Sequence, residues 1–257
     1  MKNFDMDGIV QVPSNCANSR NGAVSWWVLC SACAALALAP QPSPAAETDG
    51  VALAIIYDTS GSMGQTVPDK NGRRVPKYII ANRALMAIAR ELESFATNTA
   101  GGAPRSIQAG LFTFHQRAAK QVVPFGPLNA AAIIEWAKGF SDPHGDTPLG
   151  NALRAAGQTV LNSPLSRKHV LVITDGINTS GPPPEEVLPR LKDRAEQAHT
   201  ALSVHFIAFD VDAAVFAPVK KLGATVVGAA DEKQLESQLQ FIMQRKILLE
   251  EEEPKPK

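Results

Sequence analysis

The chain has 257 residues, of which 25 are basic and 25 are acidic, so its formal net charge is zero. This balance excludes the strongly basic surface that nucleic-acid-binding proteins use, and we expect no nucleic-acid partner. The length fits one globular domain with short additional segments.

The N-terminal segment has the pattern of an export signal. Arg20 precedes an uncharged stretch whose apolar centre is Ala23–Ala39, and Ser43-Pro44-Ala45 supplies the small residues of a cleavage site. We therefore predict a signal peptide at residues 1–45 and a periplasmic or secreted protein. The alternative is an uncleaved signal anchor, because the apolar stretch is close to the ~18 residues that span a bilayer. In that case the protein would be membrane-anchored and would face outside the cytoplasm.

All three cysteines of the chain, Cys16, Cys30 and Cys33, lie inside this predicted signal peptide. The mature chain would therefore have no disulfide, no thiolate metal site and no cysteine nucleophile. A lipoprotein box ending at Cys33 is a further alternative, although the leucine that is usual at its first position is missing.

Strands and helices are predicted to alternate along residues 51–246. Continuous apolar runs are typical of strands buried on both faces of a parallel sheet, and apolar positions every three or four residues indicate helices. The predicted strands are Val51–Tyr57, Ser106–His115, Gln121–Phe125, His169–Thr174, Leu202–Phe209 and Ala224–Val227. The predicted helices are Lys77–Thr97, Asn129–Lys138, Thr147–Leu161, Pro184–Thr200, Ala213–Leu222 and Asp231–Lys246.

This alternation predicts an α/β fold with a doubly wound, mostly parallel central sheet flanked by helices. Gln121–Phe125 is expected to be an antiparallel strand at one edge. Residues 46–50 would form a short linker, and residues 247–257 a charged, disordered tail. The polar segment Gly64–Pro76 is predicted to be a loop. It carries three basic residues that would favour an acidic partner unless they are only solvated: Lys70, Arg73 and Arg74.

Three separated segments place oxygen-bearing side chains at one predicted edge of the sheet. Asp58-Thr59-Ser60-Gly61-Ser62 follows the first buried strand, and Asp175-Gly176 follows the strand His169–Thr174. Gly145-Asp146-Thr147-Pro148-Leu149 opens a helix and can reach the same rim. Ligands of doubly wound sheets bind beyond the carboxyl ends of the strands, so we expect these segments to form one site.

The side chains of this predicted site suit a hard divalent cation. They offer three hydroxyls and two carboxylates, from Ser60, Ser62, Thr147, Asp58 and Asp175. Mg²⁺ prefers an octahedron of oxygens at about 2.1 Å and usually keeps several waters. Mn²⁺ and Ca²⁺ are further candidates. The two aspartates would balance the charge of the cation, and a carboxylate from another molecule could complete its coordination. The alternative is purely local: the serines cap a loop and Asp175-Gly176 is a turn.

This set of residues resembles the von Willebrand factor A (vWA) domain. Asp58-Thr59-Ser60-Gly61-Ser62 is similar to the Asp-x-Ser-x-Ser signature of that family. Thr147 and Asp175 follow in the order of the other two elements of its metal-ion-dependent adhesion site (MIDAS). The resemblance extends from about Val51 to about Arg245, and all five motif positions match.

The resemblance implies a Rossmann-like vWA domain at residues 51–246 with a complete MIDAS, in an exported protein of bacterial type. By the family pattern, Ser60, Ser62 and Thr147 would bind the metal directly, and Asp58 and Asp175 directly or through water. The implied function is recognition by a monomer: the domain would bind a protein or peptide that presents an acidic side chain to the bound cation. A membrane contact is expected only if the N-terminal segment stays uncleaved.

Enzyme activity is not expected. Ser62 lacks the Gly-x-Ser-x-Gly frame of many hydrolases, and the sequence has no Gly-x-x-x-x-Gly-Lys phosphate loop. The five histidines show no spacing of metal-binding pairs, and only His144 lies near the site in the sequence. Three alternatives stay open: a metal-dependent hydrolase at the same cation, an assembly or chaperone component that works with an ATPase, and a structural domain with a vestigial site.

Overall fold

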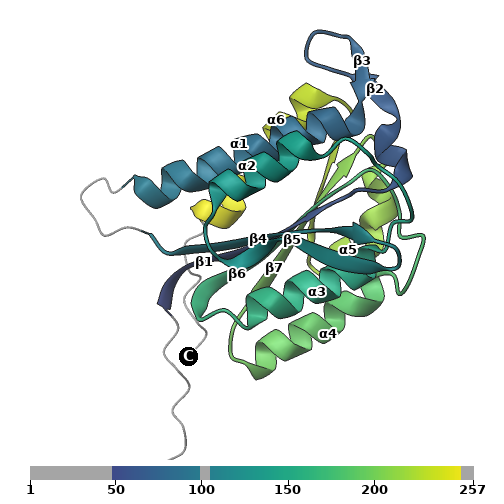
Figure 1. The fold of residues 1–257 in the computed structure, drawn as a ribbon. Helices are drawn as coiled ribbons and strands as arrows, with labels where there is room; N and C mark the ends of the chain where they lie inside the picture. Colours follow the sequence, from purple (N-terminus) through teal and green to yellow (C-terminus); the bar gives the residue numbers. More distant parts are fainter. Residues whose placement is uncertain (1–47, 99–104, 250–257) are drawn as a thin grey trace, which may run out of the picture. The chain divides into compact units, whose positions relative to one another are not determined.

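The computed structural model describes residues 48–98 and 105–249. They form a six-stranded sheet with helices on both faces (Figure 1). The predicted signal peptide at residues 1–45 lies outside the described residues, and so does the tail from Glu250 onwards. Within the part of the chain that is described, no helix is long and apolar enough to cross a membrane.

The strands of the sheet are ordered β5-β4-β1-β6-β7-β8. Strand β5 pairs antiparallel with β4, and the other neighbouring pairs are parallel. Their bounds are Thr48–Tyr57 for β1, Ile107–His115 for β4, Ala118–Pro127 for β5, Leu165–Thr174 for β6, Leu202–Phe209 for β7 and Thr225–Ala229 for β8. The predicted sheet, with its antiparallel edge strand, is confirmed.

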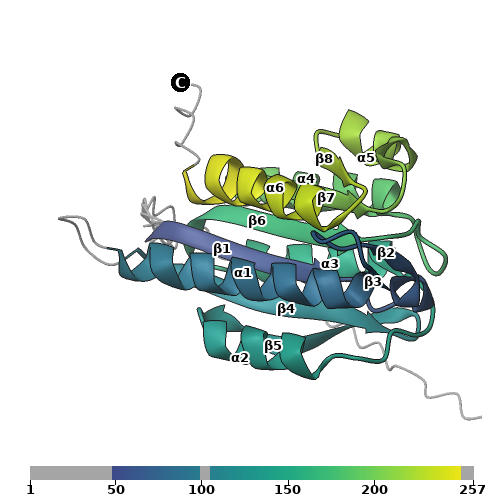
Figure 2. The same cartoon turned by 90° about the horizontal axis from the view of Figure 1, so that it is seen from above.

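Each face of the sheet carries its own hydrophobic core. Side chains alternate across a strand, so Leu53 and Ile55 of β1 face one core while Ala52 and Ala54 face the other. The first core is covered by α1 (Lys77–Thr97), α2 (Ala130–Gly139) and α6 (Glu232–Ile242) (Figure 2). The second is covered by α3 (Leu149–Leu161), α4 (Pro184–Gln197) and α5 (Ala217–Lys221).

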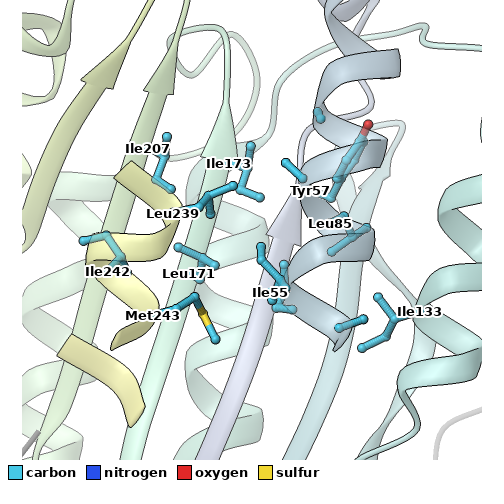
Figure 3. Close-up of a cluster of buried hydrophobic side chains, with 14 of the residues drawn as sticks. Ile55, Tyr57, Leu85, Ile133, Leu171, Ile173, Ile207, Leu239, Ile242 and Met243 are labelled. Atoms are coloured by element: carbon cyan, nitrogen blue, oxygen red, sulfur yellow. The ribbon is translucent and has the colours of Figure 1, made fainter. Parts of the chain in front are cut away.

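The first core shows how the sheet holds its helices. Ile55 and Tyr57 of β1 lie against Leu85 of α1, and Leu239 of α6 lies over the neighbouring strands (Figure 3). These four side chains are at most 4% exposed. The burial of apolar area at about 25 cal/mol per Å² is what fixes the helices on this face. Asn129 caps the start of α2, because its side chain accepts a hydrogen bond from the Ala132 N–H at 3.0 Å.

Several predicted elements differ from the structure. The predicted loop Gly64–Pro76 contains a hairpin, in which β2 (Thr66–Pro68) pairs antiparallel with β3 (Arg74–Pro76). Its turn is closed by the Asp69 carboxylate, which accepts hydrogen bonds from the N–H groups of Asn71 and Arg73 at 2.8 Å. The Asn71-Gly72 pair is a known hairpin signal, but the prolines in both strands obscured it.

The last three predicted helices are shorter or divided. Helix α4 ends at Gln197, because His199 takes a left-handed conformation with φ 55°. The predicted helix Ala213–Leu222 consists of a 3₁₀ turn, η2 (Ala213–Phe216), followed by α5. The closing helix ends its α-helical part at Ile242 and continues as a π-helical segment, η3 (Met243–Leu248).

Three aspartates occupy the same position at the ends of neighbouring parallel strands. Asp58 directly follows β1, Asp175 directly follows β6, and Asp210 directly follows β7. Parallel strands end at the same edge of the sheet, so the three carboxylates lie along one rim. The predicted site is therefore at the carboxyl edge.

Candidate metal centre

The loop after β1 is fixed by its own side chains. Asp58 accepts hydrogen bonds from the Ser60 N–H at 2.8 Å and from the Thr174 hydroxyl at 2.6 Å, so both of its oxygens are engaged. The Thr59 hydroxyl bonds to the backbone N–H and C=O of Phe114 in β4, at 3.2 and 3.3 Å. These contacts hold the loop between its two neighbouring strands, and a short 3₁₀ turn, η1 (Gly61–Gly64), follows.

Hydrogen bonds also join the three predicted segments to one another. The Gly61 N–H donates to the Gly145 carbonyl at 3.2 Å, which ties the first segment to the one before α3. The Thr147 N–H donates to the Thr179 hydroxyl at 2.8 Å, and the Thr179 N–H donates back to the Thr147 carbonyl at 3.0 Å. This ties the segment before α3 to the loop after β6. The three segments are thus one hydrogen-bonded unit.

Four of the five predicted side chains converge. The hydroxyl oxygens of Ser60 and Ser62 are 3.0 Å apart, and the Ser62 hydroxyl donates to Oδ1 of Asp175 at 2.7 Å. A methyl group placed on Gly176 would lie 3.8 Å from the Ser62 hydroxyl oxygen and 3.9 Å from that of Thr147. The hydroxyl oxygens of Ser62 and Thr147 therefore both lie close to Gly176. Asp58 positions Ser60 by accepting a hydrogen bond from its N–H.

Burial shapes the electrostatics of the site. Asp58 is fully buried, and its pKa is raised to about 6, first by burial and then by the negative charge of Asp175. Hydrogen bonds from Ser60 and Thr174 lower this pKa and only partly oppose the rise. A positive charge nearby lowers the repulsion between two buried carboxylates of this kind and favours their ionised forms.

The structure adds a residue that the sequence reasoning missed. The ammonium of Lys77, at the start of α1, lies 2.9 Å from Oδ2 of Asp175 and 2.9 Å from Oδ2 of Asp210. It also donates to Oε1 of Gln65 at 3.2 Å. Burial alone would lower the pKa of Lys77, but its hydrogen bonds to Asp210 and Asp175 outweigh burial and raise it.

A sequence signal for Lys77 did exist. Lys77 precedes Ile80, Ala81 and Ala84 by three, four and seven residues, which is the spacing of one helix face. All three are buried, so a lysine on this face is directed inward and requires an acidic partner. Asp210 offered the second signal, because it follows an apolar strand just as Asp58 does.

Other residues considered in the sequence take no part in the cluster. Asp146 is exposed. His144 is also exposed; its ring bonds the Asp142 carbonyl at 2.8 Å, and only its backbone serves the site, by donating to the Thr59 carbonyl at 2.8 Å. The basic residues of the β2–β3 hairpin, Lys70, Arg73 and Arg74, are exposed around its turn.

His169 and His205 are buried on neighbouring strands, β6 and β7, with their rings stacked at 5.6 Å. Burial lowers their pKa values to about 3 and about 4. Both histidines are therefore neutral core residues at physiological pH.

Within the described residues, no three His, Cys, Asp or Glu side chains gather as a metal site. Any cation bound at this rim would thus depend on hydroxyl oxygens as well as on carboxylates. Hydroxyl and carboxylate oxygens are the ligands of hard cations such as Mg²⁺.

Comparison with known proteins decides the family. The model of the von Willebrand factor type A domain matches residues 52–240. The chain belongs to the vWA family. No curated protein sequence matches the chain significantly.

Solved structures share the vWA fold at low sequence identity. The minor pilin PilB of Streptococcus sanguinis superimposes with a TM-score of 0.57 at 17% identity, over 77% of this chain and 62% of that protein. The vWF domain of the pili tip protein Mfa5 of Porphyromonas gingivalis superimposes with a TM-score of 0.54 at 14% identity, over 77% of this chain and 95% of that one. A third match is proximal thread matrix protein 1 of the mussel byssus, in a structure with a zinc-occupied MIDAS motif. It superimposes with a TM-score of 0.52 at 16% identity, over 77% of this chain and 48% of that one. The present chain therefore spans less than two thirds of PilB.

Proposed function

We propose that this vWA domain binds a divalent cation at the rim formed by Asp58, Ser60, Ser62, Thr147 and Asp175, and uses it to hold an acidic side chain of a protein or peptide partner. The cation would be Mg²⁺, with Mn²⁺ or Ca²⁺ as alternatives. The predicted export signal, if it acts as such, would direct this recognition to the periplasm or the cell exterior.

One observation carries the proposal, namely the spacing of the oxygens. Neighbouring ligands in an octahedron with bonds of about 2.1 Å are roughly 3.0 Å apart. The Ser60 and Ser62 hydroxyl oxygens are separated by 3.0 Å, and the Ser62 oxygen and Oδ1 of Asp175 by 2.7 Å. These three oxygens are therefore close enough together to be neighbouring ligands of a small hard cation. The zinc-occupied MIDAS motif of the mussel byssus protein gives independent support for testing a cation at the corresponding motif.

Each residue has a distinct part in the proposed site. Ser60, Ser62 and Thr147 present neutral oxygens, and Asp175 presents one oxygen while its other oxygen is held by Lys77. Asp58 keeps the serine loop in place through the Ser60 N–H. The bound cation would supply a positive centre with an open position for a carboxylate oxygen of the partner.

The hydrogen bonding favours binding over hydrolysis. A metal-dependent hydrolase requires a base that can take a proton from water. Both oxygens of Asp58 and both oxygens of Asp175 accept hydrogen bonds from the protein. Neither carboxylate is thus poised as a general base.

The test is titration of the purified domain with MgCl₂ and MnCl₂ by calorimetry, with thermal unfolding in parallel. We expect one site that is lost in Ser62→Ala. The matched control is Ser94→Ala, an exposed serine on α1 that lies roughly 25 Å along the helix from Lys77. Absence of binding by the parent protein at millimolar concentrations of both cations would refute the metal site.

The partner class is tested with peptides. Cation-loaded protein should retain a partner, or a peptide library member, that contains Asp or Glu, and EDTA should release it. Replacement of that acidic residue by its amide should abolish binding. Retention that is unchanged in EDTA would show that recognition does not use the cation.

A further inference from the structure

Lys77 brings a fixed positive charge into the proposed metal centre. Its side chain is only 3% exposed, and an ammonium has three N–H donors. Three acceptors surround it: Asp175 at 2.9 Å, Asp210 at 2.9 Å and Gln65 at 3.2 Å. Each donor has its own partner, so the ammonium is held in one place.

Asp175 connects this charge to the hydroxyl cluster. Its Oδ2 accepts from Lys77 at 2.9 Å, and its Oδ1 accepts from the Ser62 hydroxyl at 2.7 Å. The ammonium is thus one carboxylate away from the oxygens that would bind the cation. The side chain of Asp175 is fully buried, and charges at buried positions are weakly screened by solvent.

The negative charge of Asp210 partly offsets the positive charge of Lys77. The backbone of Asp210 is left-handed, with φ 53°, and its N–H donates to the carbonyl of Ala229, the last residue of β8, at 2.7 Å. The side chain is 39% exposed, so its charge is better screened than that of Asp175. Together, Asp58, Asp175, Asp210 and Lys77 bring a net charge of minus two to the rim, which matches one divalent cation.

We propose that Lys77 and Asp210 set the affinity of the site for its cation: the Lys77 ammonium orients Asp175 and weakens cation binding by charge repulsion, and Asp210 moderates this repulsion. This inference rests on the proposed cation site. By this inference the site binds its cation weakly when no partner is present, and a carboxylate of the partner is needed to retain the cation.

The charges predict opposite effects for two substitutions in the same ion pair. Lys77→Met removes a positive charge at nearly the same side-chain length, so the Kd for Mg²⁺ should fall at least about tenfold. Asp210→Asn leaves the ammonium less compensated, so the Kd should rise several-fold. The double variant restores the net charge of the parent, and its Kd should lie within a few-fold of the parent value. A purely structural ion pair would instead weaken binding in both single variants.

The experiment is calorimetric titration of parent, Lys77→Met, Asp210→Asn and the double variant with MgCl₂ and MnCl₂, at low and high NaCl. Lys77→Gln is the second neutral variant, because its amide can still donate to Asp175 if methionine impairs folding. Circular dichroism in EDTA establishes that each variant is folded. We expect the differences between variants to shrink at high NaCl.

The outcomes separate this inference from the proposed function. If the parent binds cation and both neutral variants of Lys77 bind equally or more weakly, the role of Lys77 is refuted while the cation site stands. If neither the parent nor any Lys77 variant binds cation, the proposed function itself fails. If only the Lys77 variants bind measurably, the repulsion by Lys77 is confirmed, but the parent protein does not hold a cation by itself and the proposed function fails.

Discussion

Asp58 offers a direct test of how much its buried negative charge destabilises the fold when no cation is bound. The substitution Asp58→Asn removes the charge and keeps the shape. The amide oxygen can accept from the Ser60 N–H, as the carboxylate does at 2.8 Å. The amide nitrogen can donate to the Thr174 oxygen, whose hydroxyl also lies 3.1 Å from the Gly176 carbonyl as an alternative acceptor. We therefore expect the variant to fold.

The magnitude follows from the pKa of Asp58, which rises from 3.8 to about 6 on folding, mainly through burial. Because the folded-state pKa is the higher one, the protonated form is favoured in the fold. Its contribution to stability is complete below pH 3.8 and is lost as the pH rises through 6. A shift of this size corresponds to about 3 kcal/mol of unfolding free energy.

The assay is urea unfolding of parent and Asp58→Asn in EDTA between pH 3.5 and 8. The two proteins should have similar stability at the acidic end. Above pH 7 the variant should be more stable by about 3 kcal/mol, or on the order of 10 °C in Tm for a domain of this size. Millimolar Mg²⁺ should stabilise the parent at pH 7.5 by mass action and should not stabilise the variant. A variant that is no more stable than the parent at pH 7.5 in EDTA would refute the reasoning.

Two further predictions concern packing. In Gly150→Ala the new methyl would lie 1.9 Å from the Pro182 carbonyl oxygen, so the loop after β6 must move. We expect the free energy of unfolding in urea to fall by about 1–3 kcal/mol and Mg²⁺ binding to weaken. The control is Gly139→Ala, where the methyl would have no atom within 4 Å, and both stability and Mg²⁺ binding should stay unchanged or improve slightly. In Leu85→Ala the loss of a fully buried side chain leaves a cavity, and the free energy of unfolding in urea should fall by about 2–5 kcal/mol. The comparison is Phe241→Ala, at a side chain that is 45% exposed, which should lower the free energy of unfolding far less. Equal effects in either pair would contradict the packing described here.

The apolar patterns of the sequence determined the architecture of this protein. Lys77–Thr97 and Leu202–Phe209 were predicted with the bounds that the structure has, because hydrophobic periodicity depends only on neighbouring residues. The candidate site was also predictable. Asp58 and Asp175 follow buried strands, and parallel strands end at one edge of the sheet, so the fold class placed both aspartates at the same edge. Their proximity also depends on β1 and β6 being neighbours in the sheet.

The hairpin Thr66–Pro76 is held by a tertiary contact. Lys70, in the hairpin turn, donates its N–H to the buried carboxylate of Glu232 at 2.9 Å, across 162 residues of sequence. Local propensity carries no information about a partner that far away.

The ion pair of Lys77 with Asp175 and Asp210 likewise exists only in the folded molecule. Lys77 and Asp175 are 98 residues apart, and they meet because α1 starts above the ends of β6 and β7. The sequence indicated which residues could hold a cation, since oxygen chemistry is a property of each side chain. How strongly they would hold it depends on charges that only the order of strands and the placement of α1 bring together.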